Sequence, residues 1–312
     1  MNKPSKIKIY WQVLKQSGSD FIDDKVLKLS AALAYYTIFS IAPMLIIIIF
    51  LCDLFLGKEA IEGSVYGQIR GLVGNDAAIQ IQAMIRNATL STDVSWATIV
   101  GFVTLIIGGT GVFAEIQDSI NYIWRLKAKP KKNGLLKMLF NRLLSFSLVV
   151  SMGFILLVSL AINGLMELLN ERLLAVLPQL EIVTVYITNI IITFVVITVL
   201  FAIIFKVLPD ARIKWRDVTV GAVTTSILFM LGKFAIGYYL GASKVSSTYG
   251  AAGSIVIILL WVYYSAAILY FGAVFTRVYV QYFGSRIYPN EYAVFIKQIE
   301  VTHEEEQRVT EG

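Results

Sequence analysis

The sequence predicts an all-α polytopic membrane protein with six transmembrane helices. Of its 312 residues, 57% are hydrophobic and 15% are charged, whereas soluble domains carry about 25% charged residues. The apolar residues gather in six blocks, each at least as long as the ~20 residues that cross a hydrocarbon core as a helix. Polar residues lie mostly between the blocks, because backbone groups in lipid must bond within their own segment.

The predicted spans divide the chain into three parts. Residues 1–28 form a polar, basic cytoplasmic segment, 29–283 form the membrane domain and 284–312 form a polar cytoplasmic tail. The first apolar block is too long for the apolar part of a signal peptide, so we expect it to be a retained span. The six spans are Leu29–Leu56, Trp96–Ile123, Leu139–Met166, Ile182–Leu208, Val218–Leu240 and Ser254–Tyr282.

Two helical segments are expected beside the bundle. Before the first span, Ile7, Tyr10, Trp11 and Leu14 recur at helical spacing among lysines, which predicts a short helix lying on the inner leaflet. Between the first two spans, residues 57–95 carry two apolar stripes separated by glycines. This pattern predicts an external helical hairpin, whose role is either to cover the bundle or to act as a gate or partner surface.

The distribution of basic residues predicts the orientation. The N-terminal segment, the loops after the second and fourth spans, and the C-terminal region together hold 21 lysines and arginines, against five in the alternate loops. The positive-inside rule places the basic set, and therefore both termini, in the cytoplasm. Topology also explains the net charge of +6 without nucleic acid. Anionic lipid headgroups are the expected partners of four lysines in the loop after the second span: Lys127, Lys129, Lys131 and Lys132.

Polar residues inside spans are costly and are candidates for function. The second span holds Glu115, Asp118 and Asn121 on neighbouring turns, just before its inner end. Either these groups line a substrate path, or they simply lie at the inner membrane surface. Three glycines that precede them allow close helix packing or a local break in the helix: Gly108, Gly109 and Gly111.

Lys233 and Pro43 are the other unusual residues within spans. Lys233 lies inside the fifth span, where its side chain either extends outward to the membrane surface or meets a carboxylate or an anionic headgroup. The adjacent Gly232 leaves room for a neighbouring helix. Pro43 removes a backbone hydrogen bond from the first span and is expected to kink it, which makes it a flexing residue.

Enzymatic chemistry finds little support in the sequence. No phosphate-binding loop, zinc-protease motif or cysteine pair is present. The only histidine, His303, stands in an acidic stretch of the tail, and the only cysteine is Cys52. We therefore expect no catalytic residues, no metal, no cofactor and no nucleic-acid partner.

Several motifs, in order, resemble those of the YihY/BrkB family of bacterial inner-membrane proteins. The stretch from Ser30 to Pro43 (SAALAYYTIFSIAP) resembles the family's first-span signature, and residues 121–124 (NYIW) resemble the end of its second span. Pro209 with residues 216–217 and 221–222 looks like the junction of the fourth and fifth spans. Residues 249–254, 260–264 and 271–273 look like the sixth-span signature. The resemblance runs from about residue 20 to residue 282.

The resemblance implies six spans in the inner membrane. Many members have an acidic residue where this chain has Val274, so a mechanism that needs a carboxylate there cannot operate here. Some members have carried a ribonuclease BN label, which the residues of this chain do not support. Others are called virulence factors or are linked to envelope lipid export.

Transport of a lipid or other amphipathic envelope precursor is the function that we expect. The substrate-path candidates are Glu115, Asp118, Asn121, Lys233 and Tyr249. The alternative is a non-transporting scaffold for an envelope assembly complex, in which the external hairpin binds a partner protein. A membrane-bound ribonuclease ranks third.

Overall fold

Long helices make up most of the structure, a computed structural model that describes residues 6–40, 79, 82, 111–129, 181–242, 253–283, 286–291 and 293–296. The labelled helices are α1 (Lys6–Asp23), α7 (Glu181–Val207), α8 (Trp215–Ala242) and α10 (Gly253–Tyr282). Two further helices cover Val26–Ser40 and 111–123. Four short strands follow helices at their ends: β1 (Leu126–Ala128), β2 (Ala211–Arg212), β3 (Tyr288–Pro289) and β4 (Ala293–Phe295).

Three helices of the described chain are long and apolar enough to cross a membrane, and they lie within α7, α8 and α10. Their bounds agree with the predicted fourth, fifth and sixth spans to within three residues at each end. The first and second predicted spans are described only in part, as the helices Val26–Ser40 and 111–123. The third span, and the hairpin except for helical Ile79 and Gln82, lie outside the described residues. The six-span count therefore stays a prediction.

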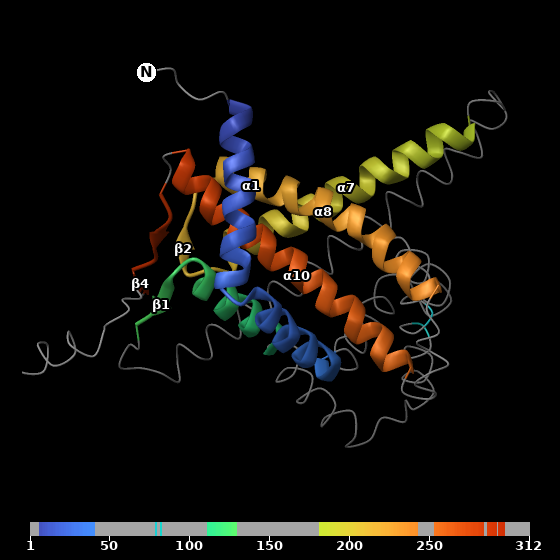
Figure 1. Cartoon of the computed structure of the whole chain (residues 1–312), viewed down its shortest axis with the longest axis horizontal. Helices are drawn as coiled ribbons and strands as arrows, with labels where there is room; N and C mark the ends of the chain where they lie inside the picture. The colour runs from blue at the N-terminus through green and yellow to red at the C-terminus, as the bar shows by residue number, and fades with distance from the viewer. Residues whose placement is uncertain are drawn as a thin grey trace, which may run out of the picture.

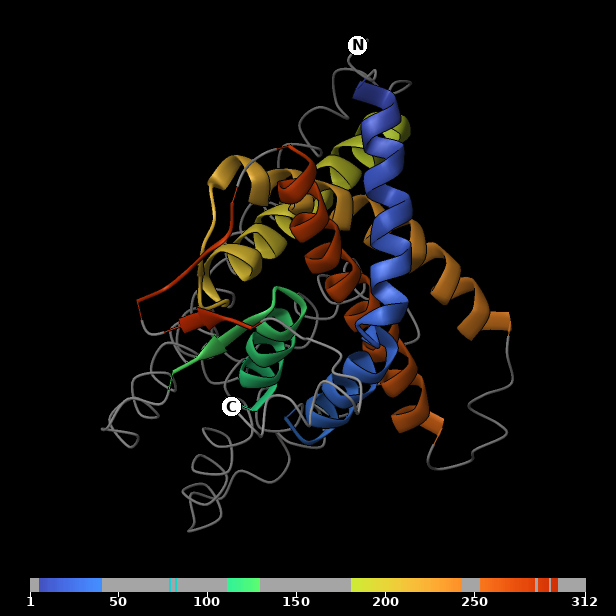
Figure 2. The ribbon, with the colours of Figure 1, turned by 60° about the vertical axis from the view of Figure 1, so that its left-hand side comes forward.

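The long helices meet at one end of the molecule and diverge toward the other (Figures 1 and 2). Helix α8 packs against both α7 and α10, and α1 packs against α10. The most deeply buried side chains, which include Trp124, Phe205 and Tyr270, form one apolar core with residues from all of these helices. Val274 is completely buried in this core.

Glycine and threonine interlock α8 with α10. A Cβ atom built on Gly221 of α8 would overlap the side chain of Thr276 on α10, and one built on Gly272 would overlap Thr225. Each helix thus offers a glycine to the threonine of the other, which lets the two backbones approach closely without hydrophobic side chains between them. Higher along the same pair, Gly232 faces the Tyr264 ring, so the prediction that Gly232 leaves room for a neighbouring helix is confirmed.

The interlocking threonines are also satisfied within their own helices. The Thr225 hydroxyl donates to the carbonyl of Gly221 and the Thr276 hydroxyl to that of Gly272, each at 2.7 Å. Such bonds to the preceding turn leave no donor unpaired in hydrocarbon. The polar residues of this interface can therefore be buried at little cost.

Short strands tie the chain segment after α10 to two of the helix ends, a feature that the all-α prediction missed. Strand β4 pairs antiparallel with β1, and β3 pairs antiparallel with β2. The segment predicted to be a polar cytoplasmic tail therefore begins with paired strands, and it is described as far as Ile296. Strands of two or three residues are too short to show the alternating pattern by which strands are recognised in a sequence.

Helix α1 confirms the predicted N-terminal helix but is longer than expected. Val13 and Ser17 are fully buried on the side that packs on α10. The ring of Tyr10 lies 5.3 Å from that of Phe283, so part of the stripe predicted to face lipid packs on protein instead. Trp11 is 68% exposed and Ile22 74% exposed, so α1 still has an outward apolar face. Contact of that face with the membrane surface stays a prediction.

Candidate functional site

Six polar residues and a helix-ending tryptophan connect the meeting helix ends, and we call them the helix junction: Asp20, Asp24, Asn121, Trp124, Arg125, Asp210 and Arg277. They come from the end of α1 and the turn after it, the end of the 111–123 helix, the turn after α7, and α10. Two of the turns need a left-handed residue, because Lys25 has φ 52° and Arg125 φ 59°. Such a conformation costs about 1 kcal/mol or more in a residue other than glycine, so the surrounding contacts must hold these turns in place.

Asp210 links the second predicted span to the turn after α7. Its carboxylate accepts hydrogen bonds from the Asn121 amide and the Gln117 amide, both at 3.0 Å. Its backbone N–H donates to the Asn121 carbonyl oxygen at 2.8 Å, and its carbonyl accepts from the backbone N–H of Asn290 at 3.0 Å. Sequence reasoning interpreted residues 209–212 as an ordinary cytoplasmic turn and gave Asp210 no role. In the structure Asp210 is only 6% exposed and joins two segments of the chain.

Buried ion pairs join α1 to α10 and to the 111–123 helix. The Arg277 guanidinium lies 2.5 Å from an Asp20 carboxylate oxygen and 3.0 Å from Asp24, and Arg125 lies 2.6 Å from Asp24. The Asp24 side chain is 1% exposed and that of Arg277 8%. Burial raises the pKa of the Asp24 carboxyl above its usual range, although the guanidiniums of Arg277 and Arg125 act in the opposite direction.

Two side-chain hydrogen bonds, one from Trp124 and one from Arg277, connect the 111–123 helix with α10. The Trp124 indole N–H donates to the carbonyl of Ala273 at 2.9 Å, and Arg277 donates to the carbonyl of Ile123. The last carbonyls of a helix lack partners within the helix, so Arg277 caps the 111–123 helix while Trp124 anchors it. Sequence reasoning missed this arginine, which was counted only as a cytoplasmic charge. The available signal was the position of an arginine within an apolar span.

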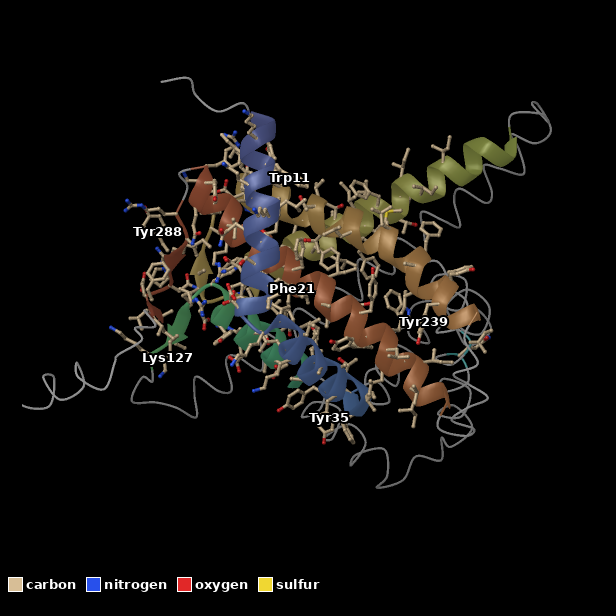
Figure 3. All side chains as sticks on the ribbon, in the orientation of Figure 1. Trp11, Phe21, Tyr35, Lys127, Tyr239 and Tyr288 are labelled. Carbon is tan, nitrogen blue, oxygen red and sulfur yellow. The ribbon has the colours of Figure 1, made fainter. Side chains whose placement is uncertain are left out.

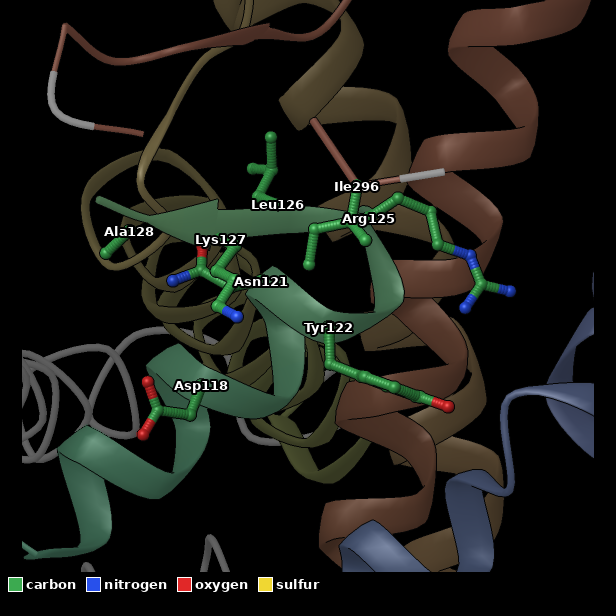
Figure 4. A pocket seen from close by; sticks show the side chains of 8 residues that line it. All are labelled: Asp118, Asn121, Tyr122, Arg125, Leu126, Lys127, Ala128 and Ile296. Atoms are coloured by element: carbon green, nitrogen blue, oxygen red, sulfur yellow. The ribbon is translucent and has the colours of Figure 1, made fainter. Parts of the chain in front are cut away.

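A pocket of about 210 Å³ opens beside the junction, under strand β1 (Figure 4). Two of the predicted path residues, Asp118 and Asn121, line it. So does Tyr122, whose ring lies 5.7 Å below the Arg125 guanidinium. Its other lining residues are Arg125, Leu126, Lys127, Ala128 and Ile296. The pocket thus combines charged groups of both signs with apolar walls.

The remaining path candidates lie elsewhere. Glu115 is half-buried one turn before Asp118, accepts a hydrogen bond from Ser119 at 3.3 Å and does not line the pocket. Lys233 is half-buried on α8 and does not line it either. Gly111 begins the described helix, and among the described residues a Cβ there would make only ordinary contact with Tyr36.

Some predicted residues cannot be placed. Of the four lysines expected to meet anionic lipid, Lys127 and Lys129 are exposed on and after β1; Figure 3 shows Lys127 at the strand-bearing end of the molecule, far from Tyr239 of α8. The other two lysines and several candidates lie outside the described residues: Lys131, Lys132, Pro43, Gly108, Gly109 and Tyr249. The described chain holds no group of three potential metal ligands.

The apolar helices and their polar junction define an integral membrane protein of the multi-pass α-helical class. Residues 18–292 match the virulence factor BrkB family, so the chain belongs to this family of bacterial inner-membrane proteins. The predicted membership is confirmed. No solved structure matches the chain.

Curated relatives carry the name UPF0761 membrane protein. One from Stenotrophomonas maltophilia is 27% identical over 78% of this chain and 55% of its own length. One from Pseudomonas aeruginosa is 27% identical over 81% and 59%, and one from Ralstonia nicotianae is 22% identical over 87% and 58%. The chain thus spans little more than half the length of these relatives.

Proposed function

We propose that the protein moves a lipid or another amphipathic envelope precursor across or within the inner membrane. The observation that carries the proposal is that charged side chains lie half-buried within helices of the membrane domain: Glu115 on the second predicted span and Lys233 on α8. Placing one such group at the centre of a bilayer costs about 2.5–3.5 kcal/mol on insertion scales. Unlike Arg277, neither residue belongs to the ion pairs that hold the helix junction together, and this supports a role for both charges in the passage of a polar group.

An unpartnered polar atom in α10 adds to this support. The Trp261 indole N–H is buried and has no hydrogen-bond partner among the described residues. A buried donor without a partner costs about 1–3 kcal/mol, unless water or a passing polar group satisfies it. A path for the polar end of an amphipathic molecule would supply such partners.

Reconstitution tests the proposal directly. The full chain is placed in vesicles of phosphatidylethanolamine and phosphatidylglycerol with a trace of fluorescent phospholipid, and a membrane-impermeant reductant quenches the outer leaflet. Protein-free vesicles protect about half of the label because the inner leaflet is inaccessible. We expect the protein to lower the protected fraction, with or without an imposed proton gradient.

Variants assign the effect to the charged residues. Glu115→Gln and Lys233→Met keep similar shapes and remove the charges, and both should slow lipid movement. Glu291→Gln is the control, since Glu291 forms an exposed surface pair with Arg212. Flux equal to that of protein-free vesicles from a correctly folded protein would refute transport of phospholipid, and unchanged flux in both variants would refute the role of the two charges.

A scaffold is the second candidate, favoured by the exposed aromatic residues near the end of α8. Phe234 is 62% exposed, Tyr238 80% and Tyr239 55%. Aromatic rings are enriched both at membrane surfaces and in protein interfaces. If a deletion phenotype is rescued by Lys233→Met but not by a variant with serine at these three positions, the scaffold replaces the transporter.

Absence of nuclease activity remains part of the proposal. A hydrolytic nuclease needs a metal or paired acid and base groups around its scissile bond, and the sequence motifs offer none. Purified protein with divalent metal added should leave structured RNA intact. Cleavage that is abolished by point variants of this chain would contradict this expectation.

A further inference from the structure

The pocket beside the helix junction carries two opposite charges that are not paired with each other. Asp118 and Lys127 both line it and both are exposed, yet neither belongs to an ion pair of the described chain. The third charged wall, Arg125, already pairs with Asp24. One negative and one positive group therefore remain available to a ligand.

We propose that this pocket binds a zwitterionic headgroup that carries a phosphate and a primary amine, as in phosphatidylethanolamine. The inference rests on the proposed function, because such a headgroup is the polar end of an amphipathic cargo. Lys127 would hold the phosphate and Asp118 the ammonium group, each through charge-assisted hydrogen bonds. A ligand with both charges satisfies both residues, whereas an anion alone leaves Asp118 facing it with a like charge.

The size and position of the pocket suit a headgroup better than a whole lipid. Its volume of about 210 Å³ is below the roughly 300–1,000 Å³ of sites that enclose drug-sized ligands. It lies where the second predicted span ends and β1 begins, the level at which headgroups would stand if the predicted topology holds. Leu126, Ala128 and Ile296 provide apolar walls for the glycerol end, and the acyl chains would stay in the bilayer.

The chemistry of the pocket favours a primary amine over a quaternary one. Choline has no N–H to donate to Asp118, and its recognition relies on cages of several aromatic rings. Among the described residues that line this pocket Tyr122 alone is aromatic, and the Arg125 guanidinium already lies over its ring. We therefore expect discrimination between ethanolamine and choline headgroups that share the same phosphate.

Calorimetric titration of the purified full chain in neutral detergent tests the inference. The probes are glycerophosphoethanolamine, glycerophosphocholine, glycerophosphoglycerol and inorganic phosphate, which separate a lipid headgroup from a free anion. We expect glycerophosphoethanolamine to bind about tenfold tighter than the other three (about 1.4 kcal/mol), since it alone offers a charged N–H donor to Asp118.

Matched variants complete the design. Asp118→Asn should abolish the preference for the amine, and Lys127→Gln should weaken binding of all four probes. The controls Asp23→Asn and Lys214→Gln change exposed charges that do not line the pocket and should bind as the unmodified chain does. Thermal unfolding confirms that each variant is folded.

The outcomes are decisive and separate from the transport test. Equal binding of glycerophosphocholine, or binding of inorganic phosphate as tight as that of the amine probe, would overturn the proposal, as would an unchanged preference in Asp118→Asn. If none of the four probes binds, the proposal is overturned too. Amine-selective binding without lipid movement in vesicles would refute transport while leaving the headgroup site intact.

Discussion

Asn121 and Asp210 hold each other through two hydrogen bonds of opposite direction. The Asn121 amide donates to the Asp210 carboxylate at 3.0 Å and its carbonyl oxygen accepts from the Asp210 backbone N–H at 2.8 Å. These residues are 89 positions apart, and both are buried. Their pairing fixes the end of the second predicted span against the turn after α7. Asn121 lines the pocket and Asp210 does not, so the position of this pocket residue depends on a residue outside the pocket.

Exchanging these two side chains should show that they act as a pair. Asn121→Asp places two carboxylates together and should destabilise the protein by about 2–3 kcal/mol. The double variant Asn121→Asp with Asp210→Asn restores one donor amide facing one carboxylate, and we expect it to recover most of the loss. Thermal unfolding in detergent, followed by tryptophan fluorescence, measures Asn121→Asp, Asp210→Asn and the double variant. Additive losses in the double variant would mean that the two residues contribute independently.

Arg277 should matter far more for stability than Arg212, although both form ion pairs. Removing Arg277 leaves Asp24 charged, buried and short of a partner, which costs about 3–5 kcal/mol. Arg212 and Glu291 form an exposed pair, with side chains 65% and 85% accessible, and such pairs contribute about 1 kcal/mol or less. The unfolding temperatures of Arg277→Met and Arg212→Met, measured side by side, compare the two. Equal losses would show that Asp20 and Asp24 are hydrated when Arg277 is absent.

The Arg277→Met variant should also become more stable on acidification. Burial already raises the pKa of Asp24, and loss of the Arg277 guanidinium removes the larger of the two neighbouring positive charges that lower it. A carboxyl whose folded pKa is raised contributes stability at low pH, which is lost as the pH rises through that pKa.

Unfolding curves between about pH 8 and about pH 5 measure this effect. We expect the difference in free energy of unfolding between Arg277→Met and the unmodified chain to become smaller as the pH falls. The double variant Arg277→Met with Asp24→Asn has no carboxyl to protonate and should lose this dependence. A constant difference across the pH range would exclude Asp24 as its cause.

The positions of the long helices could be predicted from sequence, because a run of apolar residues long enough to cross lipid has few other folds open to it. The fourth and sixth predicted spans differ from α7 and α10 by one residue at an end. Length and hydrophobicity are local properties, so one sequence contains them. The prediction for Gly232 was correct because it needed only the small size of glycine, which is also a local property.

The helix junction could not be predicted, because its contacts depend on partners far apart in the chain. Arg277 pairs with Asp20, which is 257 positions away in the sequence, and neither segment contains a pattern that indicates the other as its partner. Asp210 followed a proline in a basic loop and so resembled an exposed turn residue. A charged residue within an apolar span was the available sign, and it applied to Arg277 as much as to Lys233.

The interlocked glycines predict a difference between two substitutions on the same helix. Gly221→Ala places a methyl group against Thr276, whereas no described residue lies within 4 Å of a Cβ at Gly237. Overpacking costs about 1–3 kcal/mol, so Gly221→Ala should lower the unfolding temperature and Gly237→Ala should not. Thr276→Ala removes the opposing hydroxyl and methyl groups and leaves the Thr276 Cβ, 3.0 Å away, so it should rescue much of the loss in Gly221→Ala. If the two glycine variants unfold alike, α8 and α10 are not held by this contact.

The orientation of the molecule should place the helix junction and its pocket on the cytoplasmic side. The ends of the 111–123 helix and α7, the start of α8 and the end of α10 meet there (Figure 1), as alternating crossings require, and the 21-to-five bias of basic residues selects the side. In a Cys52→Ser background, a cysteine at Lys129 should react with a membrane-impermeant maleimide only in inverted vesicles. A cysteine at Ile79, within the predicted external hairpin, should react in intact cells. Labelling of position 129 from outside would reverse the topology and place the proposed headgroup site at the outer leaflet.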